Sequence, residues 1–265
     1  MSNPSSKGAA LITGASTGIG AVYADRLAKR GYDLILVARN EQRLNALANR
    51  LRGDTGRQVT VLPADLNDRA GRAKVEAVLR EDSNITVLVN NAGVGSVASI
   101  LQADVEDMEA MIDLNITALT RLTYAAAPAF AARGQGTIIN IASVVGIAVE
   151  VLNGVYGASK SYVLSLGHSL QKDLGDKGVR IQTVLPGATA TEFWDVAGYA
   201  AQKTSAITMS AEDLVDAALA GLDLGETVTI PGLHDDALWT RWEEDRRALG
   251  PKFGNAKPAA RYGVA

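Results

Sequence analysis

Short, almost purely apolar segments alternate with longer helical patterns along most of the chain, and this alternation strongly restricts the possible folds. Apolar segments without regular polar positions are typical of strands buried on both faces of a parallel sheet. Between them apolar residues recur at helical spacing, as in residues 41–52, where Leu44, Leu47 and Leu51 share one face. The pattern predicts strands at residues 9–13, 33–38, 59–63, 86–90, 136–142, 180–185 and 226–230.

Repeated strand–helix–strand units indicate parallel strands, because each crossover helix returns the chain to the same edge of the sheet. We therefore predict an α/β fold, namely a doubly wound, Rossmann-type parallel sheet of seven strands flanked by helices. No linker, internal repeat or low-complexity segment divides the 265 residues, which favours a single domain over residues 1–265. Residues 235–265 have an amphipathic, helical start and are interpreted as a C-terminal extension.

The composition excludes several classes of protein and site. The absence of cysteine excludes disulfides, thiolate metal sites and a cysteine nucleophile. With His168 and His234 as the two histidines, we expect no metal centre. A net charge of −3 gives no basic surface for nucleic acid. The N-terminus lacks a signal-peptide pattern and the longest apolar stretch, residues 137–152, is interrupted by polar residues, so we expect a cytoplasmic protein with no membrane span.

The first predicted strand leads directly into a glycine-rich turn, TGASTGIG at residues 13–20, which is followed by a helical pattern. Glycine lets the backbone turn tightly and approach a pyrophosphate, which the amides of a helix N-terminus stabilise. An ordinary glycine-rich turn is the alternative, but the order of strand, turn and helix favours a dinucleotide site. Gly14, Gly18 and Gly20 give the spacing G-x-x-x-G-x-G.

This spacing and further motifs resemble the short-chain dehydrogenase/reductase family over at least residues 11–191. NNAG at residues 90–93 matches the motif after the family's fourth strand, and PGATAT at residues 186–191 matches the segment beside the nicotinamide. The C-terminal stretch and residues 38–51 look like a bacterial ketoreductase-like branch of the family. The positions that match the family's catalytic tetrad are Asn115, Ser143, Tyr156 and Lys160. The resemblance implies an oxidoreductase that moves a hydride between a nicotinamide and a carbonyl or alcohol carbon.

The chemistry of these residue types agrees with the resemblance. Tyr156 and Lys160 are four residues apart on a predicted helix and therefore project from one face. A nearby ammonium, together with the positive nicotinamide of the oxidised cofactor, would favour the phenolate, so Tyr156 is predicted as general acid in reduction and general base in oxidation. Ser143 is expected to hydrogen-bond the substrate oxygen. The resemblance implies that Asn115 holds a water that links Lys160 to solvent; a structural role as a buried amide is the compatible alternative.

The end of the second predicted strand bears on the choice of cofactor. NAD-preferring members usually carry an acidic residue there, whereas this chain has Arg39. Arginine pairs well with a 2′-phosphate, which favours NADP(H), although an arginine that is solvated or stacks on adenine leaves NAD(H) open. For Asp65 and Thr191 a cap or turn role is the alternative to cofactor contact. The resemblance assigns cofactor binding to Gly14, Ser16, Thr17, Gly18, Ile19, Gly20, Arg39, Asp65, Leu66, Asn91, Ala92, Gly93, Tyr156, Lys160, Pro186, Gly187, Thr189 and Thr191.

In the family, the segment that corresponds to residues 188–210 is a lid over the substrate. Its aromatic residues Phe193 and Trp194 could form an apolar wall, which favours a small or medium apolar ketone or aldehyde; core or dimer packing is the alternative. The predicted substrate-binding residues are Ser143, Val145, Val149, Tyr156, Phe193 and Trp194.

Two other functions compete with a carbonyl reductase. A 3-oxoacyl thioester reductase would use the same tetrad, while a non-catalytic NADP(H)-sensing protein typically lacks the catalytic tyrosine or lysine, both of which are present here. The resemblance also implies a homodimer or homotetramer.

Overall fold

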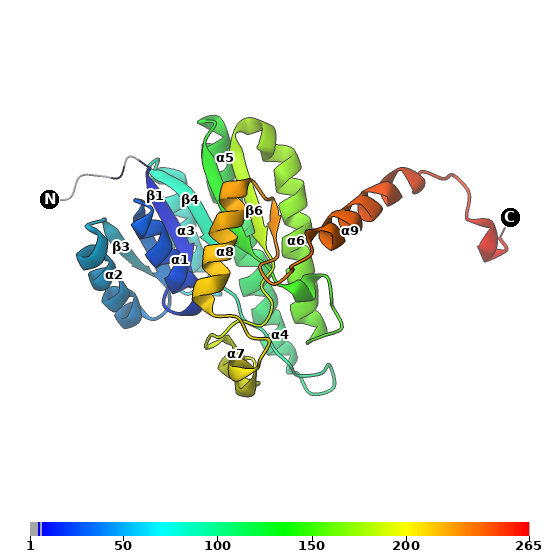
Figure 1. Cartoon of the computed structure of the whole chain (residues 1–265), viewed down its shortest axis with the longest axis horizontal. Coiled ribbons are helices and arrows are strands. Elements are labelled where there is room, and N and C mark those ends of the chain that lie inside the picture. Colours follow the sequence, from blue (N-terminus) through cyan, green and yellow to red (C-terminus); the bar gives the residue numbers. More distant parts are fainter. Residues whose placement is uncertain (1–4, 6, 265) are drawn as a thin grey trace. The chain divides into compact units, whose positions relative to one another are not determined.

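The computed structural model describes residue 5 and residues 7–264. In this part of the chain seven strands form one sheet in the order β3-β2-β1-β4-β5-β6-β7 (Figure 1), and all neighbouring strands are parallel. The predicted fold class is therefore confirmed. The strands are β1 (Ala9–Thr13), β2 (Asp33–Ala38), β3 (Val59–Pro63), β4 (Ile85–Asn90), β5 (Gly136–Ile141), β6 (Val179–Val184) and β7 (Val228–Thr229).

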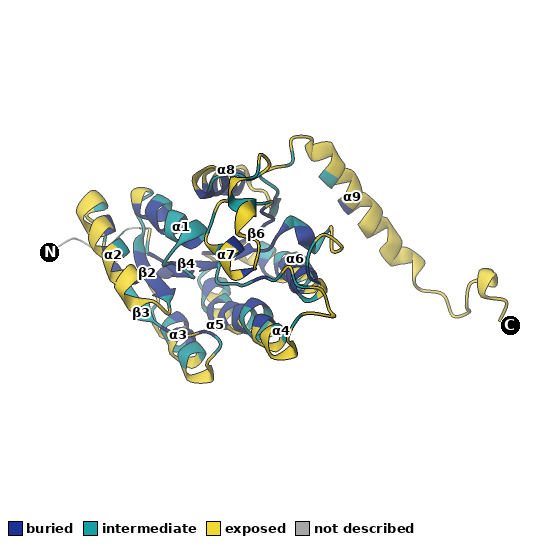
Figure 2. Cartoon of the chain, turned by 90° about the horizontal axis from the view of Figure 1, so that it is seen from below, coloured by how far each residue is buried: buried dark blue, intermediate teal, exposed yellow. Residues whose placement is uncertain are grey.

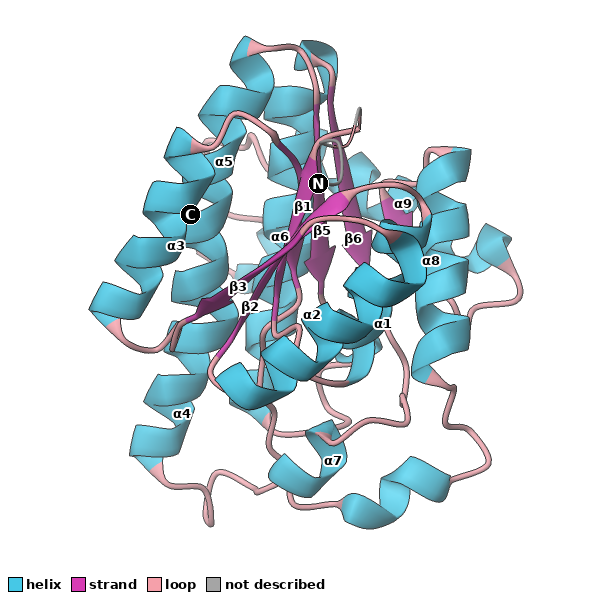
Figure 3. Cartoon of the chain, turned by 90° about the vertical axis from the view of Figure 1, so that its left-hand side faces the viewer, coloured by secondary structure: helices cyan, strands magenta, loops and turns pink. Residues whose placement is uncertain are grey.

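Helices cover both faces of this sheet (Figure 3). Helices α1, α2 and α8 pack on one face, and α3, α5 and α6 pack on the other. The helices are α1 (Gly18–Lys29), α2 (Glu41–Thr55), α3 (Arg69–Glu81), α4 (Val105–Ile112), α5 (Leu119–Ala132), α6 (Gly154–Leu174), α7 (Phe193–Val196), α8 (Ala211–Leu224) and α9 (Asp236–Leu249).

Two apolar cores, one on each face of the sheet, explain why the strands lack polar positions. Leu11 and Ile12 are neighbours in β1 and point to opposite faces, yet both are completely buried. The helices that cover the sheet turn their buried residues towards it and their exposed residues outwards (Figure 2). At about 25 cal/mol per Å² of apolar surface, this burial on both faces is the main favourable contribution to folding.

The strand order reverses between β1 and β4, and this reversal positions the site. From β1 the chain builds the sheet outwards to β2 and β3, and from β4 it builds in the other direction to β7. The loops that leave the carboxyl ends of β1 and β4 therefore diverge, and such a switch point is where open α/β sheets bind ligands.

Two elements depart from regular helices and strands. Helix α4 passes into a π-helical segment, Asp113–Ala118, and the chain continues as α5. Such segments are rare and are frequent at functional sites, and this one contains Asn115. The last predicted strand, residues 226–230, is reduced to the two residues of β7 at the edge of the sheet, just before Pro231.

Internal contacts divide the chain into two units, one up to Pro231 and one from Gly232 onwards. The second unit contains α9, which confirms the predicted helical start of this region. The Asp235 side chain caps the helix by accepting the Ala237 amide at 3.1 Å, and Trp239 stacks on Trp242 with ring centroids 4.8 Å apart. The organisation of the whole chain as a single domain stays a prediction. Among the described helices, none has the length and apolar character needed to cross a bilayer.

Candidate active site

The four predicted catalytic residues meet at the carboxyl edge of the sheet although they come from separate segments. Ser143 follows β5, Tyr156 and Lys160 are on the first two turns of α6, and Asn115 lies in the π-helical segment. All four are at least nine-tenths buried. Buried polar side chains are costly unless they are hydrogen-bonded, so their partners define what the site can do.

Tyr156 lies between Ser143 and Lys160. The Ser143 side chain is close enough to the phenol to lower its pKa. The Lys160 ammonium nitrogen lies 5.8 Å from the centre of the Tyr156 ring and donates to the Ile141 carbonyl oxygen at 3.0 Å. One face of α6 therefore presents both residues to the end of β5, as the i, i+4 spacing predicted.

Asn115 is tied to both the loop after β4 and α6. Its Oδ1 accepts the Val94 amide at 3.0 Å, and its Nδ2 donates to the Val94 carbonyl at 2.9 Å and to Ser159 Oγ at 3.1 Å. Gly93 separates Asn115 from Lys160, because a Cβ there would lie 3.1 Å from Asn115 Oδ1 and 3.4 Å from Lys160 Nζ. The structural role weighed for Asn115 is therefore present, and the water relay stays a prediction.

Burial changes the proton affinity of both catalytic side chains. It lowers the pKa of Lys160 to about 8, because the charged ammonium loses water. It also raises the pKa of Tyr156 to about 12, and the nearby Ser143 side chain opposes this only in part. The pKa of Tyr156 thus moves opposite to the direction that we expected from Lys160, since desolvation of the phenolate outweighs the other effects among these side chains.

The glycine-rich turn has the backbone that a pyrophosphate site needs. Gly14 and Gly18 have φ angles of 65° and 53°, in the left-handed region that favours glycine. At Gly20 a Cβ would lie 2.4 Å from the Gly14 carbonyl oxygen, so the helix can approach the turn closely. Thr17 precedes α1 without a side-chain cap, and the first turn contains no acidic residue. The uncapped amides therefore fit a phosphate group, with Ser16, Thr17 and Ile19 partly exposed around them.

Thr13, which sequence reasoning missed as a site residue, joins this turn to NNAG. Its hydroxyl accepts the amides of Asn91 and Ala92, both at 3.0 Å. In return, Asn91 Nδ2 donates to the Thr13 carbonyl at 2.9 Å and to the Gly14 carbonyl at 3.3 Å. The Asn91 side chain is thus engaged in holding the glycine turn. Thr13 stands immediately before the first motif glycine, which is the signal that could have identified it.

The predicted adenosine contacts lie at the ends of β2 and β3. Arg39 directly follows β2, is exposed and has no hydrogen-bond or ion-pair partner in the described part of the chain. Asp65 Oδ1 accepts the Asn67 amide at 2.9 Å, which is the turn role weighed as its alternative, and Leu66 is buried. Arg39 therefore offers an available guanidinium where a 2′-phosphate is expected.

The segment 186–191 connects the catalytic serine to the lid. The Pro186 carbonyl accepts the Ser143 hydroxyl at 3.3 Å, and Thr189 Oγ1 donates to the Gly187 carbonyl at 3.1 Å. Thr191 lies against the glycine turn, because a Cβ on Gly18 would come within 3.1 Å of its methyl group. Thr191, from the last of the predicted cofactor motifs, is thus a neighbour of Gly18, from the first.

The predicted lid, residues 188–210, is closed at its base by two backbone hydrogen bonds. The Ala190 amide donates to the Met209 carbonyl, and the Met209 amide donates to the Ala188 carbonyl, both at 2.9 Å. Trp194 is buried, and its indole donates to the Thr189 carbonyl at 2.8 Å. The Trp194 side chain therefore stabilises the lid from within.

Phe193 is the aromatic residue of the predicted lid that faces Tyr156, with ring centroids 5.6 Å apart. Val145 is buried in the same apolar cluster as Tyr156, whereas Val149 is 38% exposed. Gly95, which sequence reasoning missed, provides the space for Phe193, since a Cβ there would lie 2.3 Å from Phe193 Cζ. No periodicity marks Gly95, because its role arises from a contact with a distant segment.

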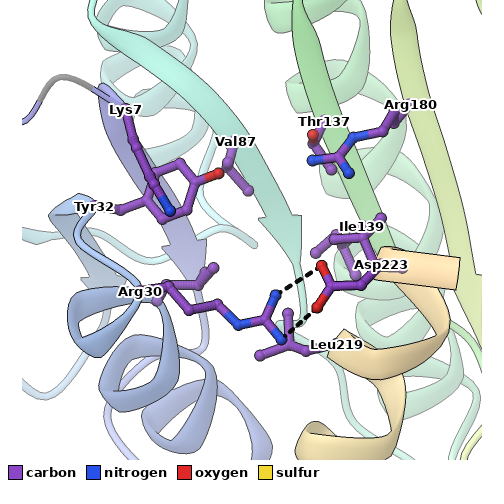
Figure 4. A pocket seen from close by; sticks show the side chains of 11 residues that line it. Lys7, Arg30, Tyr32, Val87, Thr137, Ile139, Arg180, Leu219 and Asp223 are labelled. Atoms are coloured by element: carbon purple, nitrogen blue, oxygen red, sulfur yellow. Dashed lines mark hydrogen bonds and ion pairs between the residues drawn. The ribbon is translucent and has the colours of Figure 1, made fainter. Parts of the chain in front are cut away.

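A separate cavity of about 200 Å³ lies at the opposite, amino edge of the sheet. Figure 4 shows Lys7, Arg30 and Arg180 around an apolar floor that includes Val87 and Ile139, with Arg30 paired to Asp223 at 2.9 Å. None of the tetrad residues lines it. The cavity is therefore not the candidate active site.

Comparison with known proteins agrees with this geometry. The family model described as short chain dehydrogenase matches residues 8–201. A short-chain dehydrogenase from Sphingobium yanoikuyae, solved in complex with NADPH, is 48% identical, with 96% of this chain and 100% of that chain covered and a TM-score of 0.93. The bulky-bulky ketone specific alcohol dehydrogenase from Comamonas testosteroni is 44% identical, with 96% and 98% covered and a TM-score of 0.89.

A curated relative gives the same assignment from sequence. The NADP-dependent 3-hydroxy acid dehydrogenase of Salmonella typhi is 35% identical over 218 residues, which cover 78% of this chain and 86% of the relative. The family match spans the glycine turn, NNAG, the tetrad and the start of the lid. The chain therefore belongs to the short-chain dehydrogenase/reductase family of oxidoreductases.

Proposed function

We propose that this protein is an NADPH-dependent carbonyl reductase that acts on apolar ketones, with Tyr156 as the general acid. The observation that carries the proposal is the surroundings of Tyr156, where Ser143 acts on the phenol, Lys160 Nζ lies 5.8 Å from the ring centre and the Phe193 ring centre lies 5.6 Å away. A substrate carbonyl oxygen bound between Tyr156 and Ser143 would accept a hydrogen bond from each of the two hydroxyls.

The residues divide the reduction between them as follows. Bound NADPH supplies the hydride, which adds to the carbonyl carbon. Ser143 donates a hydrogen bond to the carbonyl oxygen and orients it. Tyr156 then transfers its proton to that oxygen as the alkoxide forms, so that one hydride and one proton give the alcohol. A phenol whose pKa is raised to about 12 stays protonated at neutral pH, as an acid catalyst must.

The residues at the carboxyl edge fit this cofactor. The uncapped start of α1 and the glycine turn suit the pyrophosphate, and the available Arg39 guanidinium suits a 2′-phosphate. The NADPH complex of the Sphingobium yanoikuyae relative and the NADP dependence of the Salmonella typhi relative support the same choice.

The apolar surroundings of Tyr156 support a substrate with apolar groups on both sides of the carbonyl. Met111 and Val145 are buried against Tyr156, and Val94, Met108, Leu152, Val155 and Phe193 pack around them. The ketone specificity of the Comamonas testosteroni relative favours ketones with two bulky substituents as the first compounds to test. The 3-oxoacyl thioester reductase stays the second candidate, since it would use the same tetrad.

The test is the loss of NADPH absorbance with a panel of bulky ketones, compared for the wild type and Tyr156→Phe. Loss of a positioned general acid should lower the rate by roughly 10²–10⁴-fold, while titration should show that the variant still binds NADPH. Tyr162→Phe is the matched control, because Tyr162 is on the same helix but its hydroxyl bonds Thr120 Oγ1 at 2.8 Å.

Each outcome separates the competing functions. If Tyr156→Phe kept the wild-type rate, the mechanism would be wrong. A wild type that bound NADPH but turned over no ketone or thioester would favour the sensing protein, and activity confined to thioesters would favour the second candidate. We further expect the active protein to be cytoplasmic and to form a homodimer or homotetramer. Sedimentation can test the oligomeric state.

A further inference from the structure

Asn153 connects two segments of the candidate site that are far apart in sequence. It is the N-cap of α6, three residues before Tyr156, and is 6% exposed. Its Oδ1 accepts the amides of Val155 at 2.8 Å and Tyr156 at 3.4 Å. Its Nδ2 points the other way and donates to the Ala98 carbonyl at 2.5 Å. One buried amide thus holds the start of the catalytic helix and the loop after NNAG.

The loop that Asn153 holds, residues 94–98, forms one side of the candidate site. Val94 exchanges two hydrogen bonds with Asn115, and Gly95 accommodates the Phe193 ring next to Tyr156. The Val97 amide donates to the lid at the Ala197 carbonyl, 3.2 Å away. Loop 94–98 therefore contacts the tetrad and the lid at the same time.

Beyond Ala98 the chain forms a local turn, in which the Ser99 carbonyl accepts the Gln102 and Ala103 amides, both at 2.9 Å. Ile100 and Leu101 are more than nine-tenths exposed, and the next fixed point is Asp104, whose side chain caps α4 by accepting the Glu106 amide at 2.9 Å. The Asn153 backbone adds a second, longer contact, since its amide donates to the Ser96 carbonyl at 3.4 Å. Asn153 is thus the α6 side chain that hydrogen-bonds loop 94–98 directly at Ala98, while Asn115 links Val94 at the start of the loop to Ser159 of α6.

We propose that Asn153 is a positioning residue of this enzyme, which sets loop 94–98 against Tyr156 so that the loop forms the substrate wall. The inference rests on the proposed function, because it assigns the substrate to the space between Tyr156, Phe193 and this loop. Capping and tethering use different atoms of one side chain, Oδ1 and Nδ2, so substitution can separate them.

The test compares three substitutions that treat the two atoms differently. Asn153→Asp and Asn153→Ser keep an oxygen that can cap α6, since Asp, Asn and Ser are similarly good N-caps. Both variants lose the Nδ2 group that donates to the Ala98 carbonyl. In Asn153→Asp a second carboxylate oxygen faces that carbonyl instead. Asn153→Ala loses the cap and the tether together. Asp104→Ala is the matched control, because it removes the cap at the other end of the same loop.

We expect Asn153→Asp and Asn153→Ser to keep a melting temperature close to that of the wild type. Their KM for a bulky ketone should rise about tenfold, the effect of one lost buried hydrogen bond of ~1.4 kcal/mol, with kcat changed much less and NADPH affinity unchanged. Hydrogen exchange at Val97 should accelerate in both variants. In Asp104→Ala exchange should accelerate at Glu106, with KM and Val97 unaffected.

Other outcomes would overturn the proposal. If both capping variants matched the wild type in KM and in Val97 exchange while Asn153→Ala did not, Asn153 would be a helix cap only. An effect confined to Asn153→Asp would be a charge effect on Tyr156 and would refute the tether. Exchange at Val97 requires no turnover, so a wild type without ketone reductase activity would reject the proposed function and leave the tether measurement intact.

Discussion

Lys160 is a cation buried at the carboxyl edge, and no described carboxylate pairs with it. Its pKa is lowered from 10.5 to about 8, so between these values the unfolded chain holds more protons than the folded chain. The free energy of unfolding therefore rises with pH across this range, and below pH 8 the buried ammonium costs about 3 kcal/mol of stability. Such a cost is typical of a residue retained for chemistry rather than for folding.

We therefore predict that Lys160→Met is inactive yet more stable than the wild type near pH 7, by about 2 kcal/mol after the Ile141 carbonyl loses its donor. The gap should shrink as the pH rises from 8 towards 10. Urea unfolding at several pH values measures it, with the exposed Lys172 on the same helix as the Lys172→Met control. A less stable Lys160→Met protein at pH 7 would mean that the surroundings stabilise the ammonium.

Arg39 is an exposed, unpaired guanidinium of the described chain at the position where the two cofactors differ. A charge-assisted hydrogen bond to a 2′-phosphate contributes about 1.5–3 kcal/mol. Arg39→Ala should therefore weaken NADPH binding by roughly 10–100-fold and leave NADH binding unchanged. Titration of NADPH and NADH against Arg39→Ala measures the effect. Arg50→Ala is the control, because it removes a charge of the same kind from α2. Equal binding of NADH and NADPH by the wild type would refute the role of Arg39.

At the scale of elements, the lid and loop 94–98 meet at a contact that only glycine allows. A Cβ on Gly95 would lie 2.3 Å from Phe193 Cζ and 3.2 Å from Tyr156 Cε2. The fit of these two segments therefore depends on the size of one side chain, and overpacking of this kind typically costs 1–3 kcal/mol, about the range we expect here.

Gly95→Ala should consequently lower stability or displace the lid, and the KM for a bulky ketone should rise. Phe193→Leu removes the clashing ring end, so the double variant should recover part of the lost stability. Thermal unfolding of the single and double variants measures this, with Gly53→Ala in α2 as control, since nothing lies within 4 Å of a Cβ there. If Gly95→Ala were tolerated as well as Gly53→Ala, the contact would not be tight in solution.

At the scale of the whole molecule, the elements that sequence predicted well are those with a local cause. The glycine turn, the apolar strands and the Tyr156–Lys160 spacing all depend on neighbouring residues, and the structure has the same strands and helices within a few residues. Asn153 and Gly95 could not be identified in this way, because their roles come from contacts with segments 55 to 98 residues distant. The direction of the Tyr156 pKa also depends on burial, which a motif does not record.

The base of the lid has a consequence for protein engineering. Two main-chain hydrogen bonds between residues 188–190 and Met209 close it. Every amino acid has the main-chain groups that form such bonds, except that proline lacks the N–H donor. We therefore expect the span after Thr191 to be exchangeable as a cassette between members of the family, while Thr191 and the nucleotide-binding half keep their sequence. New substrates would then be reached by replacing one short stretch instead of redesigning the scaffold.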